Sequence, residues 1–420
     1  MARSMPAIGG LLAAALTWAA PAWGNDPGAW TPFSGGAAQK SLSGQAYDRE
    51  FVREWEANPP RGFPTLAAGN LEAMKIAIKR YGDIVAQGGW KVVPDKALEV
   101  GMTDPAVGLL AERLALSGDL RDQGVSTYFD YGLEKAVKRF QASNGLSPTG
   151  IVDKRTIVAL NVPASARLKQ LKLNLTRLQE FARAMPKRYV VVNIPAAQVE
   201  AVEGDRVVSR HAGVVGKIDR PSPLLRSAIH ELNFNPVWHL PPTVIDKDLI
   251  PRGQEMQRKG QSVLSKFGID AYDGNGRKLD PERVDWSSAQ PRGLTYKQQP
   301  GKDNPLGFLK INFHNGHSVY LHDTPSESIF GRNFRAASSG CVRVQGIEQL
   351  AAWLLVENGG WSGERIEQIK KAGERLDVKL KRPTPLYFVY ITAWATEDGV
   401  VQFRRDLYQK DGIGATAAAY

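Results

Sequence analysis

The sequence predicts a multidomain α+β protein, in which a mainly antiparallel β-sheet domain follows a small three-helix domain. Three observations carry this prediction. Valine-rich runs separated by polar and glycine-rich breaks begin at Tyr189, as in an antiparallel sheet. Between residues 105 and 160, apolar side chains recur at helical spacing. Residues 242–299 show no steady strand pattern, although β-forming segments flank them, which indicates an insertion in the sheet domain.

The first residues have the pattern of an export signal. Arg3 gives a short basic start, residues 11–20 are mostly apolar, and Ala22-Trp23-Gly24 offers small residues for cleavage. The apolar run is too short for a comfortable membrane span, although an uncleaved anchor is the alternative. We therefore expect residues 1–24 to be a signal peptide and the protein to be exported.

The charge of the chain limits its partners. The 420 residues carry a formal net charge of +11 at pH 7, which favours solubility or, alternatively, attraction to an anionic polymer such as the bacterial wall. No long block of like charges and no evident nucleic-acid motif appears, so we expect no nucleic-acid partner. A single cysteine excludes an intramolecular disulfide.

Three segments surround the small helical domain. Residues 25–60 are rich in Gly, Pro, Ser and Asn and predict an irregular arm. Residues 61–100 predict a helical scaffold segment, and residues 164–188 a connecting helix. The apolar stripes of these two helical segments are Leu71, Met74, Ile78 and Tyr81, and Leu168, Leu171, Leu175 and Leu178.

Residues 101–163 predict the small three-helix domain. Its first two helices are marked by the stripes Val107, Leu110 and Leu114, and Leu133, Val137 and Phe140. Asp153 can cap a third helix that carries Ile157 and Leu160. Periodicity alone indicates a structural bundle and says nothing further about function.

Residues 189–241 and 300–412 are expected to fold together as the sheet domain, followed by a tail at 413–420. The segment between them, 242–299, is long for a connection inside a compact domain, and such connections are often functional. A decorated surface loop is the alternative.

A hairpin near residue 315 sets the predicted position of a histidine. Asn315-Gly316 is a strong two-residue turn signal, and such a turn would place Leu309 opposite His322. Because side chains alternate along a strand, Tyr320 and His322 would share one face, while the apolar residues beside them face the core.

The single cysteine has surroundings that suit a nucleophile. Ser338-Ser339-Gly340 is small and flexible and lets backbone N–H groups approach a substrate oxygen. Cys341 and Arg343 would share a strand face, and a nearby arginine favours the thiolate. A histidine able to take the thiol proton completes the minimum for covalent acyl chemistry. The alternative is a cysteine that serves as a small buried apolar residue.

Two runs of residues resemble a known signature. They are Tyr320-Leu321-His322-Asp323-Thr324-Pro325 and Arg335-Ala336-Ala337-Ser338-Ser339-Gly340-Cys341-Val342-Arg343. They are similar to the L,D-transpeptidases with a YkuD-type catalytic domain, above all to the large Gram-negative subfamily with a lid and a peptidoglycan-binding domain. Smaller members place a second histidine where Ser339 stands here.

The resemblance implies a role for each matching residue. Cys341 is the expected nucleophile and His322 its base, with Tyr320 and the backbone N–H groups of Gly340 and Cys341 near the oxyanion. Arg335, Ser339 and Arg343 are expected to bind substrate, or the two arginines only brace the loop. Asp323 points to the opposite strand face, so we expect a backbone carbonyl to orient His322.

The resemblance also implies a fold and a location. The catalytic domain would be a YkuD-like β-sandwich, and residues 242–299 a lid over its cleft. Asn235-Pro236-Val237-Trp238 before the insertion also matches the family. The helical domain resembles the peptidoglycan-binding domain type 1, through Ala136–Gln141, Gly145-Leu146, Thr149-Gly150 and Thr156. The protein would lie in the periplasm.

The implied reaction is acyl transfer between peptidoglycan stem peptides. Cys341 would attack a donor tetrapeptide after its third residue, D-alanine would leave, and an acceptor amine would resolve the thioester into a 3→3 crosslink. No cofactor or metal is expected, and the protein would be a carbapenem target. The sequence leaves the oligomeric state open.

Other activities stay open at this point. Water as acceptor would make the protein an L,D-carboxypeptidase, and a wall-anchored protein as acceptor would make it an attachment enzyme. A zinc peptidase using His314, His317 and His322 is opposed by strand geometry, which separates His317 from His322 by about 16 Å on opposite faces. A non-catalytic peptidoglycan-binding protein is a third class.

Overall fold

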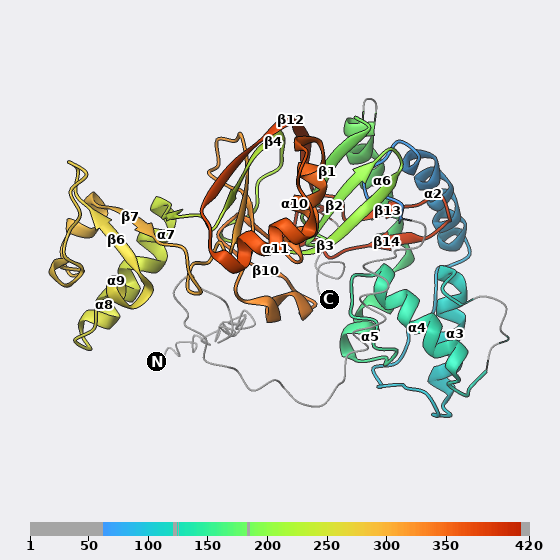
Figure 1. Cartoon of the computed structure of the whole chain (residues 1–420). Coiled ribbons are helices and arrows are strands. Elements are labelled where there is room, and N and C mark those ends of the chain that lie inside the picture. The colour runs from blue at the N-terminus through green and yellow to red at the C-terminus, as the bar shows by residue number, and fades with distance from the viewer. Residues whose placement is uncertain (1–61, 121–123, 125, 183–184, 413–420) are drawn as a thin grey trace, which may run out of the picture.

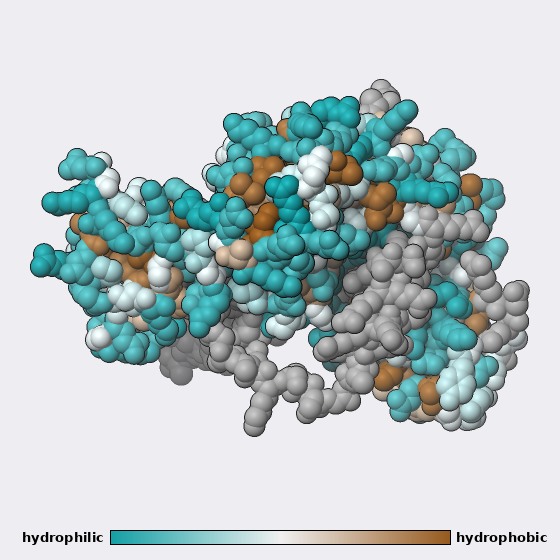
Figure 2. Space-filling model, viewed as in Figure 1, coloured by the Kyte–Doolittle hydropathy of each residue, from teal (hydrophilic) through white to brown (hydrophobic). Residues whose placement is uncertain are grey.

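The computed structural model describes residues 62–412, apart from 121–123, 125 and 183–184 (Figure 1). The predicted signal peptide, the whole predicted arm and the tail at 413–420 lie outside the described residues. No helix in the described ranges combines the length and apolar character of a membrane span. The visible surface is largely hydrophilic, with scattered apolar side chains (Figure 2).

Nine strands form the central sheet, in the order β10-β3-β11-β9-β8-β4-β12-β1-β2, and β3 also pairs with β2. This last pairing closes the sheet on itself. Most neighbours are antiparallel, and the parallel pairs are β1–β12, β9–β11 and β3–β10. The strands are β1 (Arg188–Asn193), β2 (Gln198–Glu203), β3 (Arg206–Gly216), β4 (Leu225–Phe234), β8 (Leu309–Phe313), β9 (Leu321–His322), β10 (Ala336–Ser338), β11 (Val342–Val344) and β12 (Leu376–Val389).

Strand β1 shows how the sheet separates two cores. Val190 and Val192 join the inner core, which also receives apolar residues of α10 (Ile347–Leu355) and α11 (Gly363–Ala372). Tyr189 and Val191 point to the outer face and pack in a second core. Helices α2 (Asn70–Ala86) and α6 (Ala164–Ala182) and the hairpin of β13 (Ala393–Ala395) and β14 (Val401–Phe403) complete that second core. The alternation follows from the period-2 geometry of a strand.

The three-helix domain forms as predicted. Its helices are α3 (Pro105–Ser117), α4 (Tyr131–Ser143) and α5 (Lys154–Leu160), around a core of their own. Each helix begins at an aspartate whose carboxylate accepts a backbone N–H of the first turn, and these caps are Asp104, Asp130 and Asp153. The expected cap at Asp153 is therefore confirmed.

The insertion is a folded lobe rather than a structureless loop (Figure 1). A small sheet of order β5-β7-β6 and several helices enclose a separate apolar core. Trp238, Trp286 and Tyr296 are among its buried residues. The elements are β5 (Trp238–His239), α7 (Pro242–Val244), the π-helix η2 (Ile245–Leu249), α8 (Ile250–Gln257), α9 (Val263–Phe267), β6 (Ile269–Tyr272), the 3₁₀ turns η3 (Pro281–Arg283) and η4 (Gln290–Gly293), and β7 (Thr295–Gln298).

The predicted register of the β8–β9 hairpin is wrong by one residue. Lys310, not Leu309, lies opposite His322. The Asn315 side chain closes a wider loop, because its amide donates to the carbonyls of Phe313 and Val319 while its oxygen accepts two backbone N–H groups. Ser318, with φ of 55°, takes the left-handed conformation. A one-residue shift exchanges the two faces of the partner strand, so Lys310 joins the face of His322 and Leu309 enters the core.

Two further 3₁₀ turns complete the fold. They are η5 (Glu327–Gly331), in the loop after β9, and η6 (Val356–Asn358), after α10.

Candidate active site

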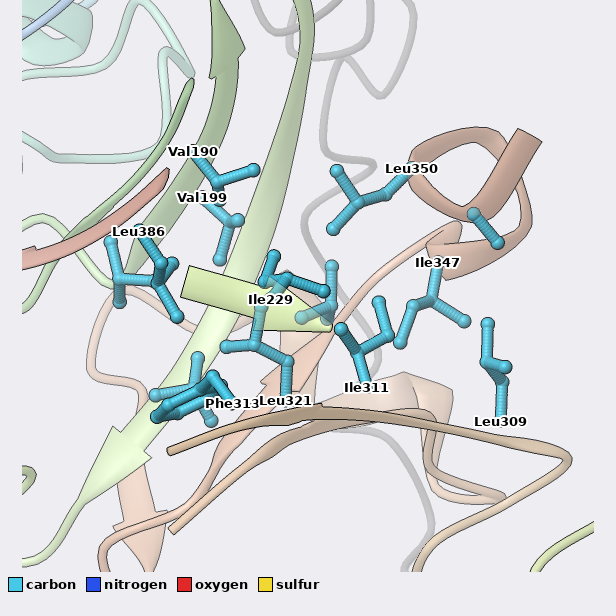
Figure 3. Close-up of a cluster of buried hydrophobic side chains, with 14 of the residues drawn as sticks. Val190, Val199, Ile229, Leu309, Ile311, Phe313, Leu321, Ile347, Leu350 and Leu386 are labelled. Carbon is cyan, nitrogen blue, oxygen red and sulfur yellow. The ribbon is translucent and has the colours of Figure 1, made fainter. Parts of the chain in front are cut away.

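Two short parallel strands bring four chemically important side chains to one face. In the β9–β11 pair, Arg343 lies opposite His322, and the Val342 N–H donates to the Tyr320 carbonyl at 3.0 Å. Because neighbouring strands in register share their faces, Tyr320, His322, Cys341 and Arg343 point to the same side. Between them, Leu321 and Val342 are fully buried in the inner core, as Figure 3 shows for Leu321 beside Ile311 and Phe313.

Two serines hold the loop that carries the cysteine. Ser338 Oγ accepts the Gly340 N–H at 3.1 Å and donates to the Cys341 carbonyl at 2.5 Å. Ser222 Oγ donates to the Gly340 carbonyl at 2.8 Å. Gly340 has φ of 113°, a conformation that side chains other than glycine rarely adopt. In this state the Gly340 N–H, which we expected at the oxyanion, is already used by Ser338.

His322 is buried and held in one tautomer. Its Nδ1 lies 2.6 Å from the carbonyl oxygen of Asp323, and since a carbonyl only accepts, Nδ1 carries the proton. The other nitrogen, Nε2, is then the basic one. The expectation that a backbone carbonyl orients this ring is confirmed. The Asp323 carboxylate itself accepts the Phe308 N–H at 3.0 Å and serves the turn after the insertion.

The charge state of His322 follows from its surroundings. Burial, reinforced by the positive charge of Arg343, lowers the pKa of His322 to about 3, although the carbonyls of Asp323 and Pro305 oppose this. The imidazole is therefore neutral at ordinary pH. A neutral imidazole can accept a proton from a thiol.

The Cys341 sulfur is a thiol at neutral pH. Burial raises the pKa of Cys341 and outweighs hydrogen bonding to Tyr320 and the charges of Lys310 and Arg343, which lower it. Arg343 thus acts in the predicted direction, but desolvation is the larger effect. The residue remains partly exposed, so a substrate can reach it.

Tyr320 ties the cysteine to the insertion. Its hydroxyl accepts the Trp238 Nε1–H at 2.9 Å, and its ring lies 5.6 Å from that of His322. Burial raises the pKa of Tyr320 well above its usual value, with the Cys341 sulfur adding to the effect. The phenol therefore keeps its proton and can donate it. Sequence reasoning gave Trp238 no role, although its Asn-Pro-x-Trp motif was a visible signal.

Lys310 is a site residue that sequence reasoning missed. It lies opposite His322, and its ammonium group is 4.5 Å from the centre of the Tyr320 ring. Burial lowers the pKa of Lys310, while Cys341 and Glu231 raise it. The observed register alone reveals this residue, because the predicted one placed Lys310 on the core face.

The three predicted substrate-binding residues differ in their surroundings. Arg335 donates to four backbone carbonyls, those of Gly213, Arg332, Ala196 and Ala197, which favours the bracing role. Arg343 is 1% exposed, and burial lowers its pKa to about 9. It lies beside the cysteine, where a substrate contact remains a prediction.

Ser339 belongs to a link with the insertion that the sequence did not suggest. Its hydroxyl accepts from Arg220 Nη1 at 2.8 Å, and the same guanidinium binds Asp248 of η2. Ser339 thus contacts the arginine that joins the sheet domain to the insertion. A role of Ser339 in substrate binding also stays a prediction.

The histidines of the alternative zinc hypothesis lie apart. His322 is buried beside Tyr320, whereas His314 stacks on His230 with ring centres 4.1 Å apart. Within the described ranges, no group of three or more His, Cys, Asp or Glu side chains is close enough to hold a metal ion.

Two parts of the chain match known families. Residues 187–367 match the family described as "L,D-transpeptidase catalytic domain" (YkuD), and residues 103–160 match "Putative peptidoglycan binding domain". The resemblance seen in the sequence is therefore confirmed.

A curated relative and several solved structures are similar to this chain. A "Putative L,D-transpeptidase" of Haemophilus influenzae is 29% identical over 245 residues, which cover 58% of this chain and 48% of that protein. The chain thus spans about half the length of this relative. An L,D-transpeptidase structure from Xylanimonas cellulosilytica is 14% identical, with 70% of this chain and 98% of that one covered and a TM-score of 0.23. One from Stackebrandtia nassauensis is 12% identical, with 70% and 94% covered and a TM-score of 0.28.

Proposed function

From the L,D-transpeptidase catalytic domain that residues 187–367 form, we propose that this protein crosslinks peptidoglycan through a thioester on Cys341. The observation that carries the proposal is the shared face of Tyr320, His322, Cys341 and Arg343 on two paired strands. The substrates are two stem peptides of the wall, a tetrapeptide donor and an acceptor with a free amine. The product is a 3→3 crosslink, and D-alanine is released.

The first half-reaction forms the thioester. His322 Nε2 takes the proton of the Cys341 thiol as the sulfur attacks the carbonyl after the third residue of the donor. The bond from that carbonyl to the terminal D-alanine nitrogen then breaks, and the imidazolium returns the proton to the leaving amine. A neutral histidine on the same strand face as a neutral thiol, with Nδ1 fixed on the Asp323 carbonyl, suits this order of events.

The second half-reaction transfers the acyl group. The acceptor amine attacks the thioester carbonyl, His322 takes a proton from that amine, and the sulfur leaves and regains a proton. The new amide bond is the crosslink. After the second half-reaction Cys341 is again a free thiol and His322 is again neutral, so the enzyme has returned to its starting state.

Tyr320 stabilises the oxyanion of both tetrahedral intermediates. Its protonated hydroxyl is fixed by the Trp238 indole, so the donor is in place before charge develops. One such donor is worth roughly 10²–10³ in rate. The backbone N–H groups of Gly340 and Cys341 assist, and for Gly340 this requires exchanging Ser338 Oγ for the oxyanion.

The insertion is a lid over this face. Trp238 at its base contacts Tyr320, and Asp248 reaches the arginine that binds Ser339. The three-helix domain is a wall-binding module, in keeping with its family match. The protein works in the periplasm after export by residues 1–24, and carbapenems acylate Cys341 as substrate mimics.

The test is product analysis with a purified disaccharide-tetrapeptide. The proposal predicts crosslinked dimer and free D-alanine, both absent with Cys341→Ala. Tripeptide without dimer would indicate an L,D-carboxypeptidase, and a stem joined to an added wall-anchored protein would indicate an attachment enzyme. Binding without any product would favour a non-catalytic wall protein. Each of these three outcomes contradicts the proposed crosslinking.

A further inference from the structure

A cavity of about 740 Å³ lies at the junction of the three-helix domain with α2, α6 and the β13–β14 hairpin. These elements lie side by side at the end of the molecule away from the insertion (Figure 1). The cavity shares no lining residue with the face that carries Cys341. Its volume is within the usual range for small-molecule sites.

The lining is rich in guanidinium groups. Arg80 of α2, Arg113 of α3, Arg139 of α4 and Arg167 of α6 each contribute one, so four different helices converge on the cavity. The lining includes two carboxylates, which leaves an excess of positive charge. Aromatic residues complete the walls, among them Tyr81, Phe140 and Phe403.

Arg113 has hydrogen-bonding capacity that the protein leaves unused. It is 3% exposed, its Nε donates to the Leu160 carbonyl at 2.9 Å, and its guanidinium stacks on Trp90 at 3.7 Å. Its Nη1 is buried without a hydrogen-bond partner. A buried unpaired N–H of a charged group is unfavourable, and a turn of the guanidinium toward the cavity would let a ligand oxygen satisfy it.

Arg80, which also lines the cavity, is held in a similar way. Its Nη2 donates to the Ser117 carbonyl at the end of α3, while its buried Nε has no partner. Gly118 allows this approach, because a Cβ there would lie 3.3 Å from the Arg80 guanidinium. Two arginines from different helices thus line one cavity, and each has one N–H without a partner.

Asp119 adds an acceptor to the same cavity. Its carboxylate accepts from Ser117 Oγ at 2.6 Å, and burial raises its pKa to about 6 despite the surrounding arginines. Guanidiniums beside a carboxylate and aromatic walls suit a ligand that carries both carboxylate and ammonium groups. A phosphate, which carries only negative charge, would be repelled by this carboxylate when it is ionised.

We propose that this cavity binds the carboxylate-bearing end of a peptidoglycan stem peptide, at a second site separate from Cys341. The inference rests on the proposed function, because α3 and α4 belong to the part that matches a peptidoglycan binding domain. Arg80 and Arg113 pair with peptide carboxylates, and Asp119 receives the ammonium group of the same peptide.

The test uses the full chain with Cys341→Ala, so that no turnover occurs, and 5-fluorotryptophan labelling read by ¹⁹F NMR. The Trp90 signal, assigned with Trp90→Phe, reports the cavity because Trp90 stacks on Arg113. We expect disaccharide-tetrapeptide to shift this signal, with the dissociation constant raised at least about tenfold by Arg80→Gln. Arg155→Gln, an exposed position on α5, is the matched control and leaves the constant unchanged.

Two chemical probes complete the test. The first probe is the same muropeptide with its carboxylates amidated. Its dissociation constant for the Arg80-containing chain is expected to equal that of the free-acid muropeptide for Arg80→Gln. No shift of Trp90, equal binding of the amidated peptide, or tighter binding of inorganic phosphate would each overturn the proposal. Carbapenem acylation of the Cys341-containing chain is measured in parallel, and its absence would contradict the proposed function without changing the cavity result.

Discussion

Arg220 binds Asp248 across the junction between the sheet domain and the insertion. The guanidinium reaches both carboxylate oxygens, at 2.7 and 3.3 Å, and the two side chains are only 11% and 5% exposed. The same Nη1 donates to Ser339 Oγ, two residues before the cysteine. One buried ion pair therefore connects the position of the insertion to the loop that carries the proposed nucleophile.

Replacing Arg220 by Met should destabilise the protein strongly. Removing one partner of a buried pair leaves the other charge uncompensated, at a cost of about 3–5 kcal/mol. The measurement is the free energy of unfolding in urea. The matched control is Arg292→Met, because Arg292 pairs with Asp246 in the same π-helix while both side chains are more than half exposed, at 63% and 52%. That control should change stability little, and equal losses in the two variants would contradict the structural role of Arg220.

Replacing Tyr320 by Phe should slow acylation of Cys341 by roughly 10²–10³, the usual effect of losing one oxyanion donor. The hydroxyl is held by Trp238 at 2.9 Å, so the change removes a positioned group and keeps the ring. The acylation rate with a carbapenem is the measurement. Tyr296→Phe, whose hydroxyl donates to the Pro291 carbonyl within the insertion, should react at the wild-type rate. A Tyr320→Phe rate within about threefold of wild type would remove the hydroxyl from the mechanism.

Replacing Lys310 by Met should make the thiol less acidic. The ammonium group lowers the pKa of Cys341, so its removal should raise that pKa. The pH at which the rate of iodoacetamide alkylation reaches half of its maximum should then be higher. Lys297→Met is the control, because this lysine lies over Tyr272 in the insertion. An unchanged alkylation profile in Lys310→Met would show that the lysine does not affect the sulfur.

The depressed pKa of His322 predicts a particular dependence of stability on pH. The unfolded chain takes up a proton on this residue below about pH 6.5, whereas the folded one resists it down to about pH 3. In this window the unfolded state binds more protons, so stability falls as pH falls, by up to about 1.4 kcal/mol per unit. The difference in unfolding free energy between wild type and His322→Gln should therefore shrink by that slope from pH 6 to pH 4. A constant difference would mean that the folded His322 titrates normally.

The elements of the fold were largely predictable because the spacing of apolar residues along the chain indicates which side chains are buried. Strand β1 alternates between two cores, and aspartates cap all three helices of the small domain. The insertion was recognised by its lack of pattern, but its own apolar core was not. That core includes Trp238, Trp286 and Tyr296. Because these residues are far apart along the chain, the local sequence does not show that they pack in one core.

The positions of site residues were predictable where they depend only on the alternation of side chains along one strand. Tyr320 and His322 share a face, as do Cys341 and Arg343, and pairing of the two strands was needed only to unite them. Lys310 was missed because the Asn315 side chain widens the turn and moves the register by one residue. The raised pKa of Cys341 could not be predicted, because sequence shows neighbouring charges but not burial, which here has the larger effect.

The most direct test of the proposed Cys341 chemistry is the intact mass of the protein after incubation with a carbapenem, followed by peptide mapping. We expect one covalent adduct, on Cys341, that disappears in Cys341→Ala and forms far more slowly in His322→Gln. A wild-type protein that stays unmodified, or an adduct that persists in Cys341→Ala, would contradict the claim that His322 and Cys341 together form the acylating pair.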